Sequence, residues 1–304
     1  MKLGILSAIF PDLTFEQVID TAASMNLKSV ELACWPSFGD KRRYAGVTHL
    51  DPDKLFPKQV EEIKAYCASK NVEISSLGYY SNPLSSDLTL ADLSIRHIYK
   101  LIDASADLGI NMVTTFIGRD QNLSVEKNLE KFEIVWTPII QYAELRKVKI
   151  AIENCPMLFT NDEWPGGKNL AFSPVIFRRM FSIIKSDYFG LNFDPSHFVW
   201  QQMDYLEVLS EFKDKLFHIH IKDTKVLKEK LKEVGILATP LEYMTPKIPG
   251  LGDIDWKAFF ERLHSVGYEG NCVLEIEDRD FEGSFEEIIK SIELSINHVQ
   301  KHVY

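Results

Sequence analysis

Four short apolar segments in the second half of the chain carry ionisable residues at every other position near their carboxyl ends. The segments are KIAIE at 149–153, GLNFD at 190–194, FHIHIK at 217–222 and VLEIE at 273–277. In an extended strand, alternate residues point to opposite faces, so each segment has one apolar face and one face that carries polar or charged groups. If the charged faces turn inward, each unpaired charge costs several kcal/mol, and something must compensate it.

Taken together, the polar faces supply three carboxylates and one imidazole, from Glu153, Asp194, His220 and Glu275. Three converging carboxylates repel one another, and a divalent cation such as Mn²⁺, Mg²⁺, Co²⁺ or Zn²⁺ removes that repulsion. The set therefore predicts one metal site, although a solvated surface with internal salt bridges would explain any single segment. His220 is the expected ligand because it is nearer the carboxyl end than His218, which we interpret as a hydrogen-bonded core histidine.

The segments that must position these residues alternate along the whole chain. Eight short runs rich in branched apolar residues alternate with eight longer amphipathic stretches, without a linker or a low-complexity segment. This order predicts a single (β/α)₈ TIM barrel of the α/β class over residues 1–304, in preference to an open doubly wound sheet. Strands are expected at 2–8, 28–33, 72–78, 112–117, 148–153, 189–194, 216–222 and 271–277, and helices at 14–26, 53–70, 88–109, 124–146, 173–185, 203–213, 255–267 and 283–301.

Long loops are expected at one end of this barrel. The stretches 34–52, 79–87, 154–172 and 223–254 all follow predicted strands, whereas the returns from helix to strand are short. Barrel enzymes build their active sites from the loops that follow the strands, at the C-terminal face. The ionisable strand ends and the long loops are therefore predicted to share that face.

Composition narrows the classes of partner and compartment. The 34 Lys and Arg oppose 44 Asp and Glu, which gives a formal charge of −10, and no basic stripe is present, so we expect no nucleic-acid partner. Four scattered cysteines without a CxxC pair predict a protein of the reducing cytoplasm. The opening MKLGILSAIF is interpreted as a strand and not as a signal peptide or membrane span. Homo-oligomerisation stays open.

Five motifs lie in order on the predicted strands and loops: IEN at 152–154, NFDPSH at 192–197, HIHIKD at 218–223, PGLGDIDW at 249–256 and GNCVLE at 270–275. With these motifs the chain resembles the xylose isomerase-like barrel superfamily, specifically its sugar phosphate isomerase/epimerase family. The resemblance implies a metal bound by Glu153, Asp194, His220 and Glu275, and His197 beside it in contact with substrate. It also implies a polyhydroxy carbonyl substrate.

These residues suit the removal of a proton next to a carbonyl. A metal that chelates the carbonyl and a neighbouring hydroxyl stabilises an enediolate, and a carboxylate within reach takes the proton. Glu153 and Glu275 come from different strands and could serve two faces of one carbon, which describes an epimerase or isomerase. His197 could be a ligand, a proton shuttle or a plain loop histidine. An enediolate that expels a leaving group would instead make an inosose dehydratase-type enzyme or a 3-keto-glycoside lyase.

Substrate contacts are predicted from three further residues. Lys222 could steady an enolate oxygen or a phosphate, or it could form a salt bridge with Asp223 or Glu277. Trp35 and Tyr79, at the ends of the second and third predicted strands, could pack on the apolar face of a sugar ring or simply pack their loops.

Comparison with other barrel families argues against an endonuclease, against a sugar-binding protein without catalysis and against the specificity of the close ketose epimerases. Endonuclease IV, a hydrolase on the same barrel, has an Asp-x-His pair some dozen residues after the histidine of its seventh strand, where this chain reads LKEVGIL at 231–237. A sugar-binding barrel without catalysis would need no set of metal ligands. The close ketose epimerases carry a further glutamate six residues after the first ligand, and Phe159 occupies that position here.

Overall fold

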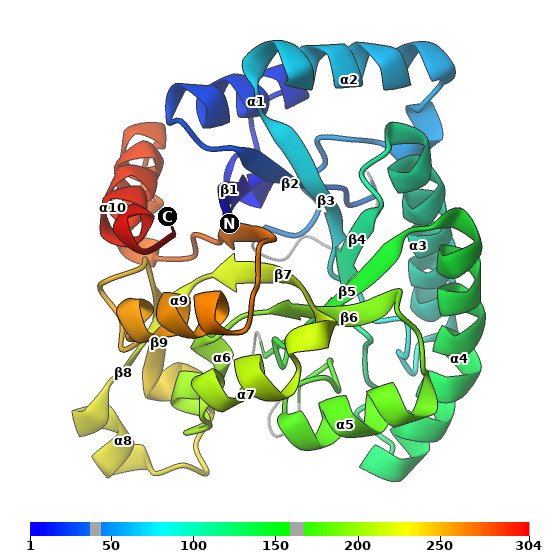
Figure 1. The fold of residues 1–304 in the computed structure, drawn as a ribbon. Helices are drawn as coiled ribbons and strands as arrows, with labels where there is room; N and C mark the ends of the chain where they lie inside the picture. The colour runs from blue at the N-terminus through cyan, green and yellow to red at the C-terminus, as the bar shows by residue number, and fades with distance from the viewer. Residues whose placement is uncertain (37–43, 159–166, 304) are drawn as a thin grey trace.

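Eight parallel strands form a closed barrel in the computed structural model, which describes residues 1–36, 44–158 and 167–303 (Figure 1). The strand order is β1-β10-β7-β6-β5-β4-β3-β2, and β1 closes the ring by pairing with both β2 and β10. The predicted fold class is therefore confirmed, and all eight predicted strands are present. The barrel strands are β1 (Lys2–Leu6), β2 (Ser29–Ala33), β3 (Glu73–Tyr79), β4 (Met112–Thr115), β5 (Lys149–Glu153), β6 (Phe189–Phe193), β7 (Leu216–Ile221) and β10 (Asn271–Leu274).

The predicted helices surround the barrel (Figure 1). Local chemistry sets their ends: Thr14 and Gln17 form a reciprocal capping box at the first helix, and Gly109 ends the third in the left-handed region, at φ 72°. The helices that cover the barrel are α1 (Phe15–Ser24), α2 (Pro57–Lys70), α3 (Leu88–Leu108), α4 (Val125–Arg146), α5 (Pro174–Ile183), α7 (Tyr205–Glu211), α9 (Trp256–Ser265) and α10 (Phe285–Val303).

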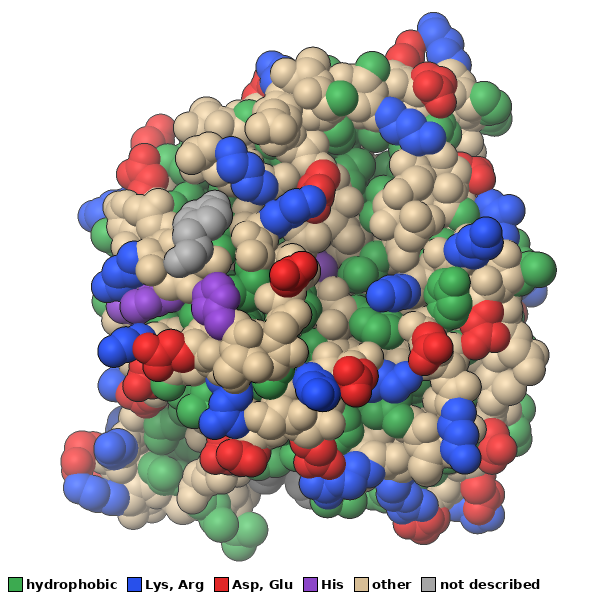
Figure 2. Space-filling view, viewed as in Figure 1, with side chains coloured by type: hydrophobic (Ala, Val, Ile, Leu, Met, Phe, Trp, Pro, Cys, Tyr) green, Lys and Arg blue, Asp and Glu red, His purple; other side chains and the backbone are tan. Residues whose placement is uncertain are grey.

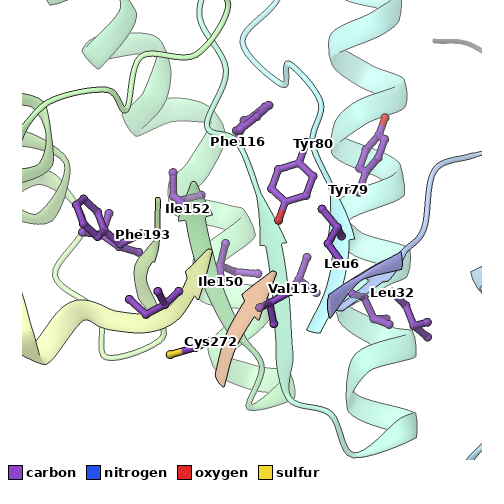
Figure 3. Packing of buried hydrophobic residues seen from close by; sticks show 14 of the residues in the cluster. Leu6, Leu32, Tyr79, Tyr80, Val113, Phe116, Ile150, Ile152, Phe193 and Cys272 are labelled. Atoms are coloured by element: carbon purple, nitrogen blue, oxygen red, sulfur yellow. The ribbon is translucent and has the colours of Figure 1, made fainter. Parts of the chain in front are cut away.

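The layer between strands and helices is apolar and rich in aromatic rings. Figure 3 shows part of the buried hydrophobic core, on both faces of the strands. On β6, Phe189 packs on Trp136 of α4 with ring centroids 6.4 Å apart, and Phe193 packs on Phe259 of α9 at 6.5 Å. The odd-numbered residues of β6 thus face the helices. Because strand residues alternate, Asn192 lies on the other face, inside the barrel.

One long insertion carries structure that the sequence pattern did not predict. After β7 the chain forms an antiparallel pair, β8 (Asp223–Val226) with β9 (Met244–Lys247), and α8 (Lys228–Val234) lies between them. A short helix, α6 (Ser196–Trp200), also follows β6 directly. Among the described residues, the 3-10 turns are η1 (Ser7–Ile9), η2 (Pro52–Lys54), η4 (Lys213–Lys215), η5 (Pro240–Glu242) and η6 (Arg279–Phe281).

Asp223 attaches this insertion to the barrel. Its Oδ1 accepts hydrogen bonds from the backbone N–H groups of Thr224 at 2.8 Å and Ile254 at 3.2 Å. Its Oδ2 accepts from the backbone N–H of Gly250 at 3.0 Å and from Nε1 of Trp256 at 2.9 Å. The PGLGDIDW motif is therefore the structural partner of this fully buried carboxylate.

Two predicted loops lie partly outside the described residues. The loop 34–52 contains 37–43, and the loop 154–172 contains 159–166, so Phe159 lies outside the described residues. In the ranges that the structure describes, no helix is both long enough and apolar enough to cross a bilayer. On the face drawn in Figure 2, Lys and Arg side chains are interspersed with Asp and Glu.

Candidate metal centre

Three of the four predicted metal ligands meet inside the barrel. Glu153 is the last residue of β5, His220 is the penultimate residue of β7, and Glu275 directly follows β10. Nδ1 of His220 lies 2.8 Å from Oε2 of Glu275 and 3.8 Å from Oε1 of Glu153. One ligand atom from each residue lies within 4.8 Å of the other two, and all three residues are buried. The strand ends thus bring two carboxylates and one imidazole to one point.

Asp194, the fourth predicted ligand, is held beside this group by the turn that follows β6. Its carboxylate accepts hydrogen bonds from the backbone N–H of Ser196 at 2.7 Å and from the Ser196 hydroxyl at 2.9 Å. Oδ2 of Asp194 lies 3.0 Å from Nε2 of His197, which in turn lies 3.8 Å from Oε1 of Glu153. Among the described residues, Asp194 belongs to no group of three possible ligand atoms that lie within 4.8 Å of one another. Glu153, Cys155 and His197 do form such a group, beside that of Glu153, His220 and Glu275.

The two histidines of β7 have different surroundings. Both ring nitrogens of His218 are within hydrogen-bonding distance of neutral groups, Nδ1 at 3.0 Å from Asn192 Oδ1 and Nε2 at 3.1 Å from Ser75 Oγ. Burial lowers the pKa of His218 to about 4, so its ring is neutral at pH 7. His218 is therefore the hydrogen-bonded core histidine that the sequence predicts, and His220 is the one that faces Glu153 and Glu275.

The atoms that face one another at this point suit a cation. Nδ1 of His220 and Oε2 of Glu275 lie 2.8 Å apart, are buried and, among the described residues, have no hydrogen-bond partner of acceptable geometry. Buried polar atoms are normally satisfied, so unsatisfied ones that converge need an explanation. Imidazole nitrogens and carboxylate oxygens are the donors that Zn²⁺, Mn²⁺, Co²⁺ and Mg²⁺ accept. The residues present therefore fit the implied divalent metal.

Lys222 lies at the edge of the same group. Its Nζ donates to Oε1 of Glu275 at 3.0 Å and also pairs with Glu277. Burial by itself would raise the pKa of Glu275, but Lys222 and His220 together lower it well below its ordinary value. Lys222 thus forms the salt bridge with Glu277 that was one alternative predicted for it, and its contact with an enolate oxygen or a phosphate stays a prediction.

The aromatic residues divide between the inside and the outside of the barrel wall. Tyr79 packs edge-on against His97 of α3 with ring centroids 4.6 Å apart, and Trp35 packs on both Tyr79 and Tyr80. Tyr80, the next residue, points inward (Figure 3). Its hydroxyl lies 3.3 Å from Nε2 of His220. The structure thus places Tyr79 toward the helices and behind Trp35, and the tyrosine beside the predicted ligands is Tyr80.

Glu31 is a site residue that the sequence pattern did not single out. It lies in the middle of β2, has no exposed surface, and its Oε2 is 2.8 Å from Nε2 of His220. Its Oε1 accepts hydrogen bonds from Thr114 at 2.6 Å and from Tyr80. Burial by itself would raise the pKa of Glu31, but His220, His218 and Thr114 bring it below its ordinary value. A lone charge inside the buried run SVELA was the available signal.

With this geometry in place, comparison with known proteins identifies the family. The chain belongs to the xylose isomerase-like TIM barrel family, whose pattern matches residues 19–298. The resemblance inferred from the motifs is therefore confirmed. An inosose dehydratase from Clostridium perfringens is 36% identical over 93 residues, which are 29% of this chain and 30% of that protein.

Solved structures share the whole fold. The structure of IolI protein with a bound zinc atom superimposes with a TM-score of 0.73 at 18% sequence identity and covers 99% of each chain. A D-psicose 3-epimerase from Clostridium cellulolyticum H10, solved with D-tagatose, gives a TM-score of 0.69 at 13% identity and covers 100% of this chain and 99% of that one. At such low identity, these likenesses establish the barrel fold alone.

Proposed function

We propose that this protein is a divalent-metal-dependent isomerase or epimerase of a sugar or sugar phosphate. The observation that carries the proposal is the convergence of Glu153 and Glu275, from different strands, on the unsatisfied Nδ1 of His220. Glu153, Asp194, His220 and Glu275 are proposed to hold one Mn²⁺, Mg²⁺, Co²⁺ or Zn²⁺ ion. A cation bound there supplies Lewis-acid polarisation of a carbonyl and stabilises negative charge on its oxygen.

The two glutamates are proposed to move the proton. One carboxylate removes a proton from the carbon next to the carbonyl, and the C–H electron pair becomes part of the carbon–carbon double bond of an enediolate. If the other glutamate returns a proton to the opposite face of that carbon, the product is an epimer. If a proton returns to the neighbouring carbon, the product is the aldose or ketose isomer. Glu153 and Glu275 approach His220 from different strands, which suits transfer on two faces.

Neighbouring residues are proposed to bind the substrate. His197 lies between Asp194 and Glu153, at 3.0 and 3.8 Å, where it can donate to a substrate hydroxyl or shuttle a proton. Lys222, already beside Glu275, can neutralise an enolate oxygen or a phosphate. Trp35, which packs on Tyr79 and is 6% exposed, is the proposed contact for the apolar face of a sugar ring. The net charge of −10 argues against a nucleic-acid partner and leaves a small carbohydrate as the proposed one, and four free cysteines support a reducing cytoplasm as location.

A dehydratase or lyase is the second candidate, because an inosose dehydratase is 36% identical to this chain over 93 residues. In that reaction the enediolate forms in the same way. Its electron pair then expels a hydroxide or alkoxide from the next carbon, which leaves as water or alcohol after it gains a proton. The residues that remove the first proton are the same, so solvent exchange and product analysis together separate the two reactions.

The test is incubation with ketoses, inososes and 3-keto-glycosides in D₂O, with the product followed by NMR. We expect deuterium at the carbon next to the carbonyl, and loss of turnover in Glu153→Gln and Glu275→Gln. The matched control is Glu126→Gln, which changes an exposed glutamate paired with Arg179 on the surface. Product formed without solvent deuterium would contradict free proton exchange, and release of water or alcohol would assign the second candidate.

A further inference from the structure

The second ring nitrogen of His220 faces Glu31, on the opposite side of the ring from Glu153 and Glu275. We infer that Glu31 is a positioning residue that fixes the proton of His220 on Nε2, so that Nδ1 presents its lone pair to the cation. This inference rests on the proposed metal site. Metal-binding histidines commonly donate their other N–H to a carboxylate, which fixes the tautomer and the ring orientation.

The hydrogen-bond donors around Glu31 favour a proton on Nε2 of His220. Thr114 and Tyr80 both donate their hydroxyl hydrogens to Oε1 of Glu31. The Tyr80 hydroxyl, 3.3 Å from Nε2, has therefore no hydrogen left to donate to the ring. Oε2 of Glu31, 2.8 Å from Nε2, is an acceptor without a hydrogen of its own, so Nε2 must carry the proton that joins them.

The side-chain amide of Asn192 is also oriented by its hydrogen-bond partners. Its Oδ1 lies 3.0 Å from Nδ1 of His218, which turns its Nδ2 toward Tyr80, 3.1 Å from the hydroxyl. The amide N–H₂ donates one hydrogen to the tyrosine oxygen, and its nitrogen also lies 3.0 Å from Nε2 of His220. The amide nitrogen offers the ring no acceptor, so the proton on Nε2 has the carboxylate of Glu31 as its partner.

The strands are irregular next to the residues that form this network. The register between β2 and β3 shifts between Val30 and Glu31, and the register between β6 and β7 shifts between Leu191 and Asn192. Such bulges re-aim side chains and are common next to active sites. On β3, a Cβ atom at Gly78 would lie 2.5 Å from Oε1 of Glu31, so only glycine leaves room for the carboxylate. Three strands are therefore shaped around the contact between Glu31 and His220.

The first test measures Zn²⁺ affinity by competition with a chromogenic chelator. Glu31→Gln keeps the volume of the side chain but can turn either an oxygen or an NH₂ group toward Nε2, so the tautomer is no longer fixed. We expect Zn²⁺ binding to weaken by about 10- to 100-fold. The control is Thr115→Val, an isosteric change at a fully buried residue whose hydroxyl hydrogen-bonds its neighbouring carbonyl, and it should bind Zn²⁺ as the wild type does.

The second test needs no variant that must fold. In the Zn²⁺-loaded wild-type protein with ¹⁵N-labelled histidine, the His220 spectrum should show a protonated Nε2 and an unprotonated Nδ1. A proton on Nδ1, or unchanged Zn²⁺ affinity in Glu31→Gln, would overturn the role of Glu31 while leaving the metal site in place. A wild-type protein that binds no Zn²⁺ would overturn the metal site and the role of Glu31 together.

Discussion

Replacement of Asp223 by asparagine should loosen the attachment of the insertion to the barrel. Asp223 accepts four hydrogen bonds, two on each carboxylate oxygen. An asparagine keeps one oxygen and replaces the other by an NH₂ group. In either orientation, two N–H groups then face this NH₂ group, which is itself a donor, and lose their acceptor. In one orientation these are the Gly250 amide and the Trp256 indole, and in the other they are the Thr224 and Ile254 amides.

The expected loss follows from the cost of those two donors. A buried donor without a partner costs about 1–3 kcal/mol, so two cost about 2–6 kcal/mol. Gly250 is exposed and its amide can reach water, which reduces the loss in that orientation. Burial raises the pKa of Asp223, which means that the charged form is itself disfavoured, and removal of the charge offsets a further part. We therefore expect the free energy of unfolding to fall by about 2–4 kcal/mol.

The assay is urea unfolding followed by circular dichroism, with a chelator present so that metal binding adds nothing to stability. Hydrogen exchange of the Trp256 indole N–H should accelerate in parallel, because that group loses its acceptor. Asp253→Asn is the matched control on the same turn, since Asp253 pairs with Lys225 and the Val226 amide at the surface, and it should cost less than about 1 kcal/mol. Equal losses in the two variants, with unchanged exchange at Trp256, would refute the reasoning.

Two further predictions concern the metal and the class of substrate. His220→Ala should remove most of the bound divalent metal, whereas His218→Ala should retain it and lose stability through its unsatisfied partners Asn192 and Ser75; metal analysis by mass spectrometry checks this, and the reverse pattern would show that the wrong histidine was chosen. The protein should neither cleave an abasic duplex nor bind DNA in a salt-dependent manner, because it carries a net charge of −10; a gel-based cleavage assay tests this, and cleavage would place the protein among nucleases.

Strong periodicity made the barrel predictable from the sequence. The eight strands and the eight covering helices lie where the alternation of apolar residues predicts them, because each element buries one defined face. The sequence does not predict the pair of β8 and β9, because these strands bury no defined face. Its second strand, MTPK, is only partly buried along its whole length and contains Pro246, so it has neither alternation nor strand propensity.

The sequence predicts the residues that are proposed as metal ligands, but it does not predict the residues that surround them. Glu153, His220 and Glu275 follow from strict alternation on short strands, which the structure keeps. Alternation does not predict which way a side chain points where the chain leaves a strand or where the register shifts. Tyr80, and not Tyr79, lies inside the barrel just past the end of β3, and Glu31 lies at a bulge whose position no local pattern records. The contacts of Asp194 with Ser196 and His197 depend on the short helix α6, which has no amphipathic signal.

The closure of the barrel by β1 has a consequence for how the protein folds. β1 pairs with β2, which is close in the sequence, but also with β10, so that Lys2 lies opposite Asn271. During synthesis, one edge of β1 therefore has no partner strand until nearly the whole chain has been made. An unpaired strand edge is a template for wrong pairing, and contacts between distant residues slow folding. The nascent chain is thus expected to depend on chaperones until β10 emerges from the ribosome.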